Sequence, residues 1–160
     1  IISPGLRVAA IACTEPTLMR KLVIGKQSTD VHSPNLNQAI VDAYLREGIL
    51  MDHIRKISES YGKQMAKMQE MLSTFPASVQ YTRPDGGIFL WVELPEDFNA
   101  TKLLTTATEM GVAYIPGTHF YAVPDTHHNT MRLNFSNATL ENIEKGMTIL
   151  KELFISQGLK

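Results

Sequence analysis

The chain has 160 residues, of which 44% are hydrophobic and 19% charged, and its formal net charge at pH 7 is -1. A chain of this length can bury about 70% of the surface that it exposes when unfolded. The small net charge excludes the strongly basic surface that attracts nucleic acids or anionic membranes. No apolar run approaches the roughly 20 residues of a membrane-spanning helix. We therefore expect a soluble cytoplasmic protein that acts on small molecules and binds neither nucleic acid nor membrane.

Cysteine and histidine give no alternative site. The single cysteine, Cys13, cannot form an internal disulfide, which fits a reducing compartment, and we expect it to be a buried, inert thiol with no catalytic role. The histidines lack the spacing of metal ligands: three stand alone and two are neighbours in a polar loop, namely His32, His53, His119, His127 and His128. We expect no bound metal.

The first 50 residues are predicted to form a strand and two helices. Apolar residues 6–12 predict the strand, and residues 14–25 predict a short helix with Thr14 as its N-cap. Residues 34–46 predict a second helix that ends before Gly48. This β-α-α unit has no partner strand of its own, so without neighbours from outside the segment its strand is expected to pair with a second copy or to be disordered.

A long helix is predicted from Asp52 to about residue 74. Its apolar residues recur at intervals of three and four and form one stripe: Ile54, Ile57, Tyr61, Met65, Met68 and Leu72. Such a stripe is typical of a core or of a seat for a neighbouring domain. The change of pattern around residues 48–52 predicts two parts, residues 1–50 and residues 51–160.

The second part is predicted to have an α+β fold. Residues 79–83 and 88–92 predict two strands that are joined by a tight turn containing Gly86 and Gly87. A helix capped by Asn99, short strands at residues 112–115 and 130–135, and a last helix capped by Thr139 follow. This order predicts an antiparallel or mixed sheet with helices on one face.

Arg132 is the most informative polar residue, because it stands inside the apolar strand 130–135. An unpaired charge is costly to remove from water, so an anion is expected beside the guanidinium. One interpretation is an internal ion pair with Glu93 or another carboxylate. The other is a receptor for a substrate carboxylate, which matches the fork of N–H donors on arginine.

Four motifs occur in order along the chain: Pro4-Gly5-Leu6-Arg7, then Tyr81-x-x-Pro84-x-Gly86-Gly87-Ile88-Phe89-Leu90-Trp91, then Gly111-Val112-x-x-x-Pro116-Gly117-x-x-Phe120, and finally Arg132-Leu133-x-Phe135. With this order and spacing, the sequence resembles the C-terminal segment of pyridoxal phosphate-dependent aminotransferases of class I/II, which have fold type I. The resemblance covers essentially all 160 residues.

The resemblance implies roles for two arginines. Arg7 would bind the phosphate of pyridoxal phosphate, and Arg132 would bind the α-carboxylate of the amino acid. Residues 1–50 would be the remainder of a large cofactor-binding domain, and the long helix would bridge it to the small C-terminal domain. The lysine that carries the cofactor would stand just before Ile1, so we expect no catalytic residue in this chain.

For the parent protein, the resemblance implies a homodimeric transaminase that moves an amino group between an α-amino acid and a 2-oxo acid. The isolated chain is expected to be inactive and not to bind pyridoxal phosphate. The alternative parent is a bacterial transcription regulator in which an aminotransferase-like domain binds the effector. A free-standing interaction module is disfavoured by the N-terminal unit without a partner strand. The identity of the amino acid stays open.

Overall fold

The computed structural model describes residues 1–123 and 125–160. It contains two compact units, Ile1–Ile57 and Ser58–Lys160. Helix α3 (Leu50–Leu72) continues across the division between them. The predicted boundary near residue 50, between a cofactor-binding and a small domain, stays a prediction.

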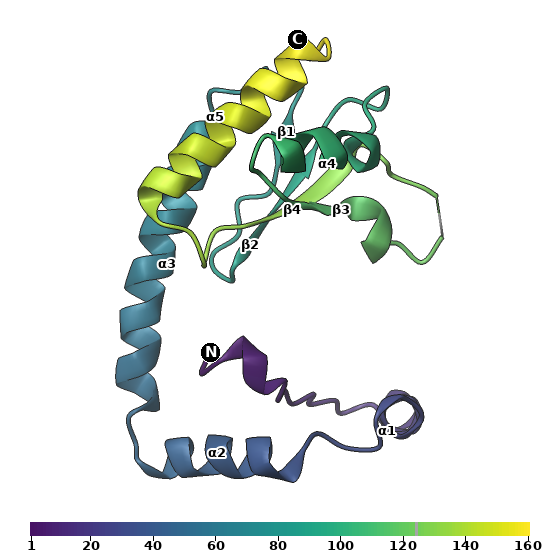
Figure 1. Ribbon diagram of the computed structural model, residues 1–160. Coiled ribbons are helices and arrows are strands. Elements are labelled where there is room, and N and C mark those ends of the chain that lie inside the picture. Colours follow the sequence, from purple (N-terminus) through teal and green to yellow (C-terminus); the bar gives the residue numbers. More distant parts are fainter. Residues whose placement is uncertain (124) are drawn as a thin grey trace. The chain divides into compact units, whose positions relative to one another are not determined.

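The first unit contains helices and no strand. It consists of the 3-10 turn η1 (Pro4–Leu6), helix α1 (Pro16–Thr29), helix α2 (Asn35–Arg46) and the beginning of α3 (Figure 1). The strand predicted at residues 6–12 is wrong, because residues 7–15 have no regular secondary structure. A strand requires a neighbour with which to exchange backbone hydrogen bonds, and residues 1–57 provide none.

Helix α1 begins one residue later than predicted because Glu15, rather than Thr14, is its N-cap. The Glu15 carboxylate accepts hydrogen bonds from the backbone N–H groups of Leu18 and Thr17. These bonds to the charged form lower the pKa of Glu15, with the bond from Leu18 as the largest cause. The helix also passes through Gly25, where we expected its end, because a glycine inside a helix costs only about 1 kcal/mol.

The second unit is built on a four-stranded sheet within its described residues. The strands are β1 (Gln80–Tyr81), β2 (Phe89–Glu93), β3 (Ile115–Pro116) and β4 (Thr130–Asn134). They lie in the order β1-β2-β4-β3, and every neighbouring pair is antiparallel. The α+β fold with an antiparallel sheet is therefore confirmed.

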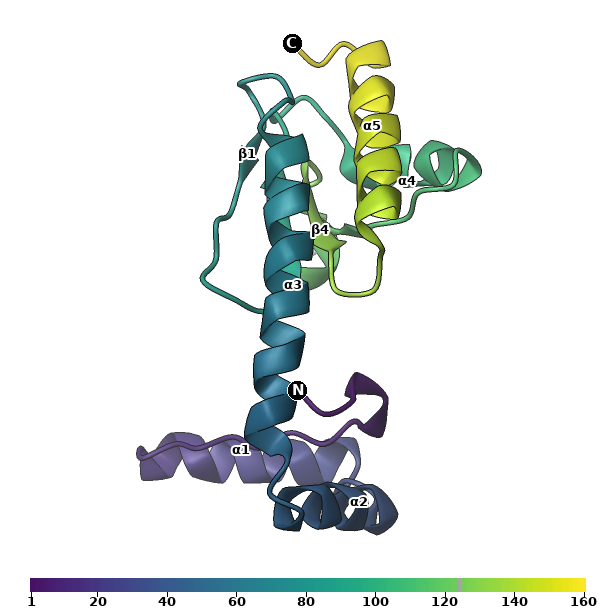
Figure 2. The same ribbon diagram turned by 90° about the vertical axis from the view of Figure 1, so that its left-hand side faces the viewer.

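Helices cover one face of this sheet. In both views, α5 (Leu140–Ser156) and residues 58–72 of α3 lie side by side against it, and α4 (Ala100–Glu109) packs beside α5 (Figures 1 and 2). The side chains of Asn99 and Thr139 cap α4 and α5 as predicted. The core that fills this layer includes the following buried residues from helices and strands: Met68, Leu72, Leu90, Val92, Met131, Leu133, Ile143, Met147, Leu150 and Phe154.

The first unit differs from the second in having no buried residue: every residue of 1–57 is half-buried or exposed. Cys13, which we expected to be buried, is among the half-buried residues. Eleven large apolar residues of this unit are at least 44% exposed, namely Ile1, Ile11, Leu18, Val23, Ile24, Val31, Leu36, Ile40, Leu45, Ile49 and Met51. Residues 1–57 therefore have no hydrophobic core of their own.

Candidate functional site

Arg132 lies on the face of the sheet opposite to the helices. Side chains alternate between the two faces along a strand. In β4, Met131 and Leu133 are buried in the core, so Arg132 between them points to the other face. Its direct neighbours across the sheet are Trp91 of β2 and Ile115 of β3. The guanidinium thus stands on the central part of the sheet face that the core helices leave free.

Two aromatic rings contact the Arg132 guanidinium. The central carbon of the guanidinium lies 3.8 Å from the centroid of the Phe89 ring and 4.6 Å from that of the Phe120 ring. Both distances are within the range of cation–π attraction. The Nε atom of Arg132 is buried and has no hydrogen-bond partner among the described residues. Arg132 is therefore held by rings and retains an unused N–H donor.

The internal ion pair that the sequence left open is not observed. Among residues 1–123 and 125–160, no carboxylate lies within the 4.0 Å ion-pair distance of Arg132. Glu93, the expected partner, is exposed at the end of β2, where it stands opposite Thr130. The positive charge of Arg132 is consequently not neutralised by the described part of the chain.

Phe120 reaches Arg132 through the 3-10 turn η2 (Gly117–Phe120), which directly follows β3. The turn lies very close to β4, because a Cβ atom on Gly117 would stand 1.8 Å from the hydroxyl oxygen of Thr130. Only glycine permits this approach. Trp91 and Phe120 form a T-shaped pair, with ring centroids 5.6 Å apart and an angle of 80° between the planes.

The aromatic contacts continue beyond Phe120. Trp91 also contacts Tyr121, with ring centroids 6.0 Å apart, and Tyr121 stacks on His127 at 3.8 Å with nearly parallel planes. We call Phe89, Trp91, Phe120, Tyr121 and His127 the aromatic cluster. Of its members, Phe89 and Phe120 contact the Arg132 guanidinium, and next to such apolar rings the attraction of a cation to an anion is less screened than in water.

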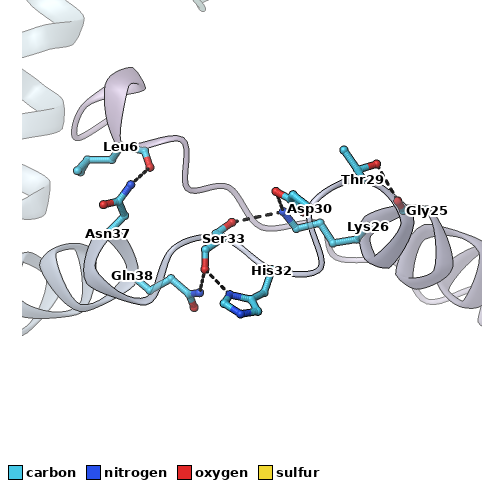
Figure 3. Close-up of polar contacts among 9 residues, drawn as sticks. All are labelled: Leu6, Gly25, Lys26, Thr29, Asp30, His32, Ser33, Asn37 and Gln38. Carbon is cyan, nitrogen blue, oxygen red and sulfur yellow. Dashed lines mark hydrogen bonds and ion pairs between the residues drawn. The ribbon is translucent and has the colours of Figure 1, made fainter.

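Arg7, the second predicted site residue, lies in the first unit at the end of η1. It is exposed, and its backbone is in the left-handed region, with φ of 55°. Asn37 of α2 donates a hydrogen bond of 2.9 Å to the carbonyl of Leu6 and so fixes the residue before Arg7 (Figure 3). A non-glycine residue in this conformation is strained and is often found at a functional site.

Figure 3 shows how the connection between α1 and α2 is held. Lys26 forms an ion pair of 2.7 Å with Asp30, and Gln38 donates a hydrogen bond of 2.7 Å to the carbonyl of Ser33. The Nδ1 atom of His32 lies 2.8 Å from the same carbonyl. Within the described residues, no group of three or more His, Cys, Asp or Glu side chains is arranged to hold a metal.

The sequence did not reveal the aromatic contacts of Arg132. Phe89 could have been found, because the two-residue period of β2 places it on the same face as Trp91. Phe120 could not, because a turn of four residues carries no periodic signal that predicts which way its last side chain points. Arg7 and Arg132 belong to different units.

The described residues contain no helix that is both long and apolar enough to cross a bilayer.

Comparison with known proteins shows what the chain is similar to. Residues 2–150 match the family described as aminotransferase class I and II. The aromatic-amino-acid aminotransferase 1 of Thermococcus litoralis is 42% identical over 95% of this chain. The chain covers 36% of that relative's length. A helix-turn-helix transcriptional regulator of Bacillus subtilis is more distant, with 29% identity over 95% of this chain.

Solved structures of aminotransferases are also similar to this chain. The kynurenine aminotransferase of Pyrococcus horikoshii, in complex with PMP, is 38% identical to this chain and superposes on it with a TM-score of 0.75. The match covers 91% of this chain and 36% of the chain of that enzyme. The α-aminoadipate aminotransferase of Thermus thermophilus, complexed with N-(5'-phosphopyridoxyl)-L-leucine, is 37% identical with a TM-score of 0.72, over 96% of this chain and 40% of its own. The chain therefore belongs to the class I and II aminotransferase family.

Proposed function

We propose that the protein carrying this chain transfers an amino group between an α-amino acid and a 2-oxo acid with pyridoxal phosphate as cofactor. In this proposal Arg132 binds the α-carboxylate of the substrate and Arg7 binds the phosphate of the cofactor. The substrate side chain stays unassigned, because the carboxylate that Arg132 would bind is common to all α-amino acids.

The observation that carries the proposal is the unneutralised charge of Arg132. Its guanidinium contacts two aromatic rings, its Nε is buried without a partner among the described residues, and no described carboxylate pairs with it. A carboxylate accepts two parallel hydrogen bonds from a guanidinium. An incoming substrate would supply the anion that the described part of the chain does not, and its amino group would be oriented by that contact.

Arg7 fits a phosphate group in its chemistry and its exposure. Its Nη1 makes one long hydrogen bond, of 3.4 Å, to the carbonyl of Pro4, and the side chain is otherwise open to solvent. The guanidinium is always charged and has five N–H donors. Pyridoxal phosphate, when bound, supplies the electron sink for bond cleavage at the substrate Cα. Arg7 would contribute only to holding that group in place.

We propose that the lysine which binds the cofactor covalently lies outside these 160 residues. This agrees with the chain's covering 36% of the length of its relative. The isolated chain is expected to form no stoichiometric adduct with pyridoxal phosphate that borohydride can trap. Mass spectrometry of the treated chain checks this, and one fully modified lysine at a defined position would contradict it.

The experiment for Arg132 compares two substitutions in the full-length protein. Arg132→Ala removes the charge, whereas Arg132→Lys keeps a charge but loses the fork of donors. A screen of amino donors that includes L-phenylalanine, L-leucine and L-2-aminoadipate first identifies the substrate. The value of kcat/KM is then measured for that amino acid and for the amine that lacks only the α-carboxylate.

We expect Arg132→Ala to lower kcat/KM for the amino acid by about 10- to 150-fold for each hydrogen bond lost to the carboxylate, since each is worth about 1.5–3 kcal/mol. Turnover of the amine should change little. Arg132→Lys should recover part of the loss. Equal effects of Arg132→Ala on amino acid and amine would contradict the role of Arg132, and no transamination by the wild-type protein would contradict the proposed function as a whole.

The homodimeric state and the cytoplasmic location of the full-length protein are also proposals. They rest on the family and on the single cysteine of the chain. Light scattering of the purified full-length protein measures the oligomeric state, and a monomer at micromolar concentration would contradict the first of them.

A further inference from the structure

We propose that Phe89 and Phe120 are positioning residues that fix the Arg132 guanidinium for binding a carboxylate. This inference rests on the proposed function, because it concerns how Arg132 is held and not whether it binds substrate. Both rings lie within cation–π distance of the guanidinium carbon, at 3.8 Å and 4.6 Å.

Arginine side chains have several rotatable bonds, so a guanidinium needs contacts that fix its plane. Hydrogen bonds usually do this, but the buried Nε of Arg132 has no partner among the described residues, and no described carboxylate pairs with the group. The two rings are therefore the contacts that hold its plane. They do so without occupying any N–H donor, which leaves the donors available to a carboxylate.

The two rings come from elements that are fixed independently. Phe89 is set by the register of β2 and β4, in which it stands opposite Asn134 while Arg132 stands opposite Trp91. Phe89 is thus the diagonal neighbour of Arg132, at a spacing that aromatic side chains can bridge. Phe120 is set by η2, which lies close against β4, and by its T-shaped contact with Trp91. Aromatic rings from two separate elements thus converge on one cation.

An aromatic support also has an electrostatic advantage over a carboxylate. A second anion next to the guanidinium would compete with the substrate carboxylate for the same donors and would have to be displaced. The face of an aromatic ring attracts the cation but cannot accept its strong hydrogen bonds in the plane. The arrangement therefore holds Arg132 in place without reducing its affinity for an incoming anion.

The test measures binding to the full-length protein by isothermal titration calorimetry. The two probes are 3-phenylpropionate, which has a carboxylate, and 3-phenylpropanamide, its neutral counterpart of the same shape. The ratio of their dissociation constants measures carboxylate recognition alone. A residue that only stabilises the fold would change both constants together and would leave the ratio unchanged.

We expect Phe89→Leu to reduce the preference for the carboxylate probe by about 3- to 30-fold, and Phe120→Leu by about 2- to 10-fold, as expected for the loss of one cation–π contact. Phe89→Tyr, which keeps an aromatic ring, should restore most of the preference. The matched control is Phe98→Leu, the same change at a half-buried ring that packs on the core of this unit. It should leave the ratio unchanged.

A double-mutant cycle separates this inference from the proposed function. In an Arg132→Ala background, Phe89→Leu should have no further effect on the ratio, because the rings act through the arginine. If the wild-type protein shows no carboxylate preference, or Arg132→Ala leaves it intact, the proposed function fails. If Arg132→Ala abolishes the preference while Phe89→Leu and Phe120→Leu both keep it, only the positioning role is wrong.

Because Phe89 is half-buried, its replacement by leucine can also lower stability, and Phe120 provides the second variant. Its side chain is 47% exposed, so Phe120→Leu removes little from the core. An unchanged ratio in a folded Phe120→Leu protein would remove Phe120 from the proposal even if Phe89→Leu were too unstable to measure. If Phe89→Leu cannot be measured, Phe89→Tyr decides for this residue. The role of Phe89 then requires that Phe89→Tyr has a ratio of dissociation constants close to that of the wild type.

Discussion

Gly117 and Thr130 approach each other so closely that no side chain fits between them. A Cβ atom on Gly117 would lie 1.8 Å from the Thr130 hydroxyl oxygen and 2.7 Å from its Cβ. Thr130 cannot easily move away, because its hydroxyl donates a hydrogen bond of 2.7 Å to the carbonyl of His127 and its backbone belongs to β4. This contact sets the position of η2 and hence of Phe120.

We expect Gly117→Ala to destabilise the protein by about 1–3 kcal/mol, since overpacking forces the backbone to shift. Chemical denaturation measures the change in the free energy of unfolding. The matched control is Gly146→Ala in α5, where a Cβ would be in ordinary contact with Val112 at 3.7 Å. Alanine favours a helix over glycine by about 1 kcal/mol, so the control should be neutral or stabilising. A neutral Gly117→Ala would show that the turn is not fixed by this contact.

The N-cap of α5 gives a second prediction. The Thr139 hydroxyl oxygen accepts a hydrogen bond of 3.1 Å from the backbone N–H of Asn142. Thr139→Ala should lower the free energy of unfolding by about 1 kcal/mol, because one N–H at the helix start loses its partner. Thr148→Ala, an exposed position within the same helix, is the control and should cost little, because alanine is the better helix former. Equal losses in both variants would argue against the cap.

Tyr114 predicts a dependence of stability on alkaline pH. Its hydroxyl donates a hydrogen bond of 2.7 Å to the carbonyl of Ala100, and burial raises the pKa of Tyr114 above its usual value of 10.0. Above about pH 10 the unfolded chain loses this proton while the folded chain keeps it. The stabilising contribution is therefore complete below pH 10 and is lost as the pH rises toward the folded-state pKa.

Tyr114→Phe should accordingly lower the free energy of unfolding by about 1 kcal/mol at pH 7, where the hydrogen bond is lost. The deficit should shrink by up to about 1.4 kcal/mol for each pH unit above 10, because phenylalanine cannot ionise. Urea denaturation of both proteins from pH 7 to 11 measures it. The other four tyrosines are the same in both chains, so parallel stability curves would contradict the prediction.

The absence of buried residues in 1–57 leads to a fourth prediction. In the isolated chain, backbone amides of α1 and α2 should exchange at least about 100-fold faster than those of β4 and α5, since local stability follows buried apolar contacts. Hydrogen–deuterium exchange with mass spectrometry resolves the two regions. Comparable protection of the amides in both regions would contradict this prediction, because it would mean that residues 1–57 bury apolar side chains in solution.

Much of the second unit could be predicted from the sequence. The continuous apolar run at residues 88–92 and the helical spacing of Leu140–Ser156 are both local patterns, so the strand and the helix can be read from one segment each. The N-caps Asn99 and Thr139 are also predictable from the sequence. Each side chain accepts a hydrogen bond from the backbone N–H only three residues later, so the cap is a local feature. Arg132 could be predicted to be a site residue because it is a charged residue inside an apolar strand.

Features that depend on distant residues could not be predicted. The apolar residues 6–12 have the composition of a strand but no neighbour among residues 1–57, and pairing is not encoded in a single segment. The choice between a carboxylate and aromatic rings as the surroundings of Arg132 depended on where Glu93 and Phe120 came to lie. For Phe120, that position is set by the contact between Gly117 and Thr130, which lie 13 residues apart in the chain.

Trp91 is the only tryptophan of the 160 residues, and it stands directly opposite Arg132 in the sheet. Its indole also meets Phe120 and Tyr121 edge-on. Intrinsic fluorescence excited near the red edge of indole absorption would thus arise from one place in this segment, next to the guanidinium. The chain carries its own unlabelled optical reporter, and an anion arriving at Arg132 would change the emission without any engineered dye.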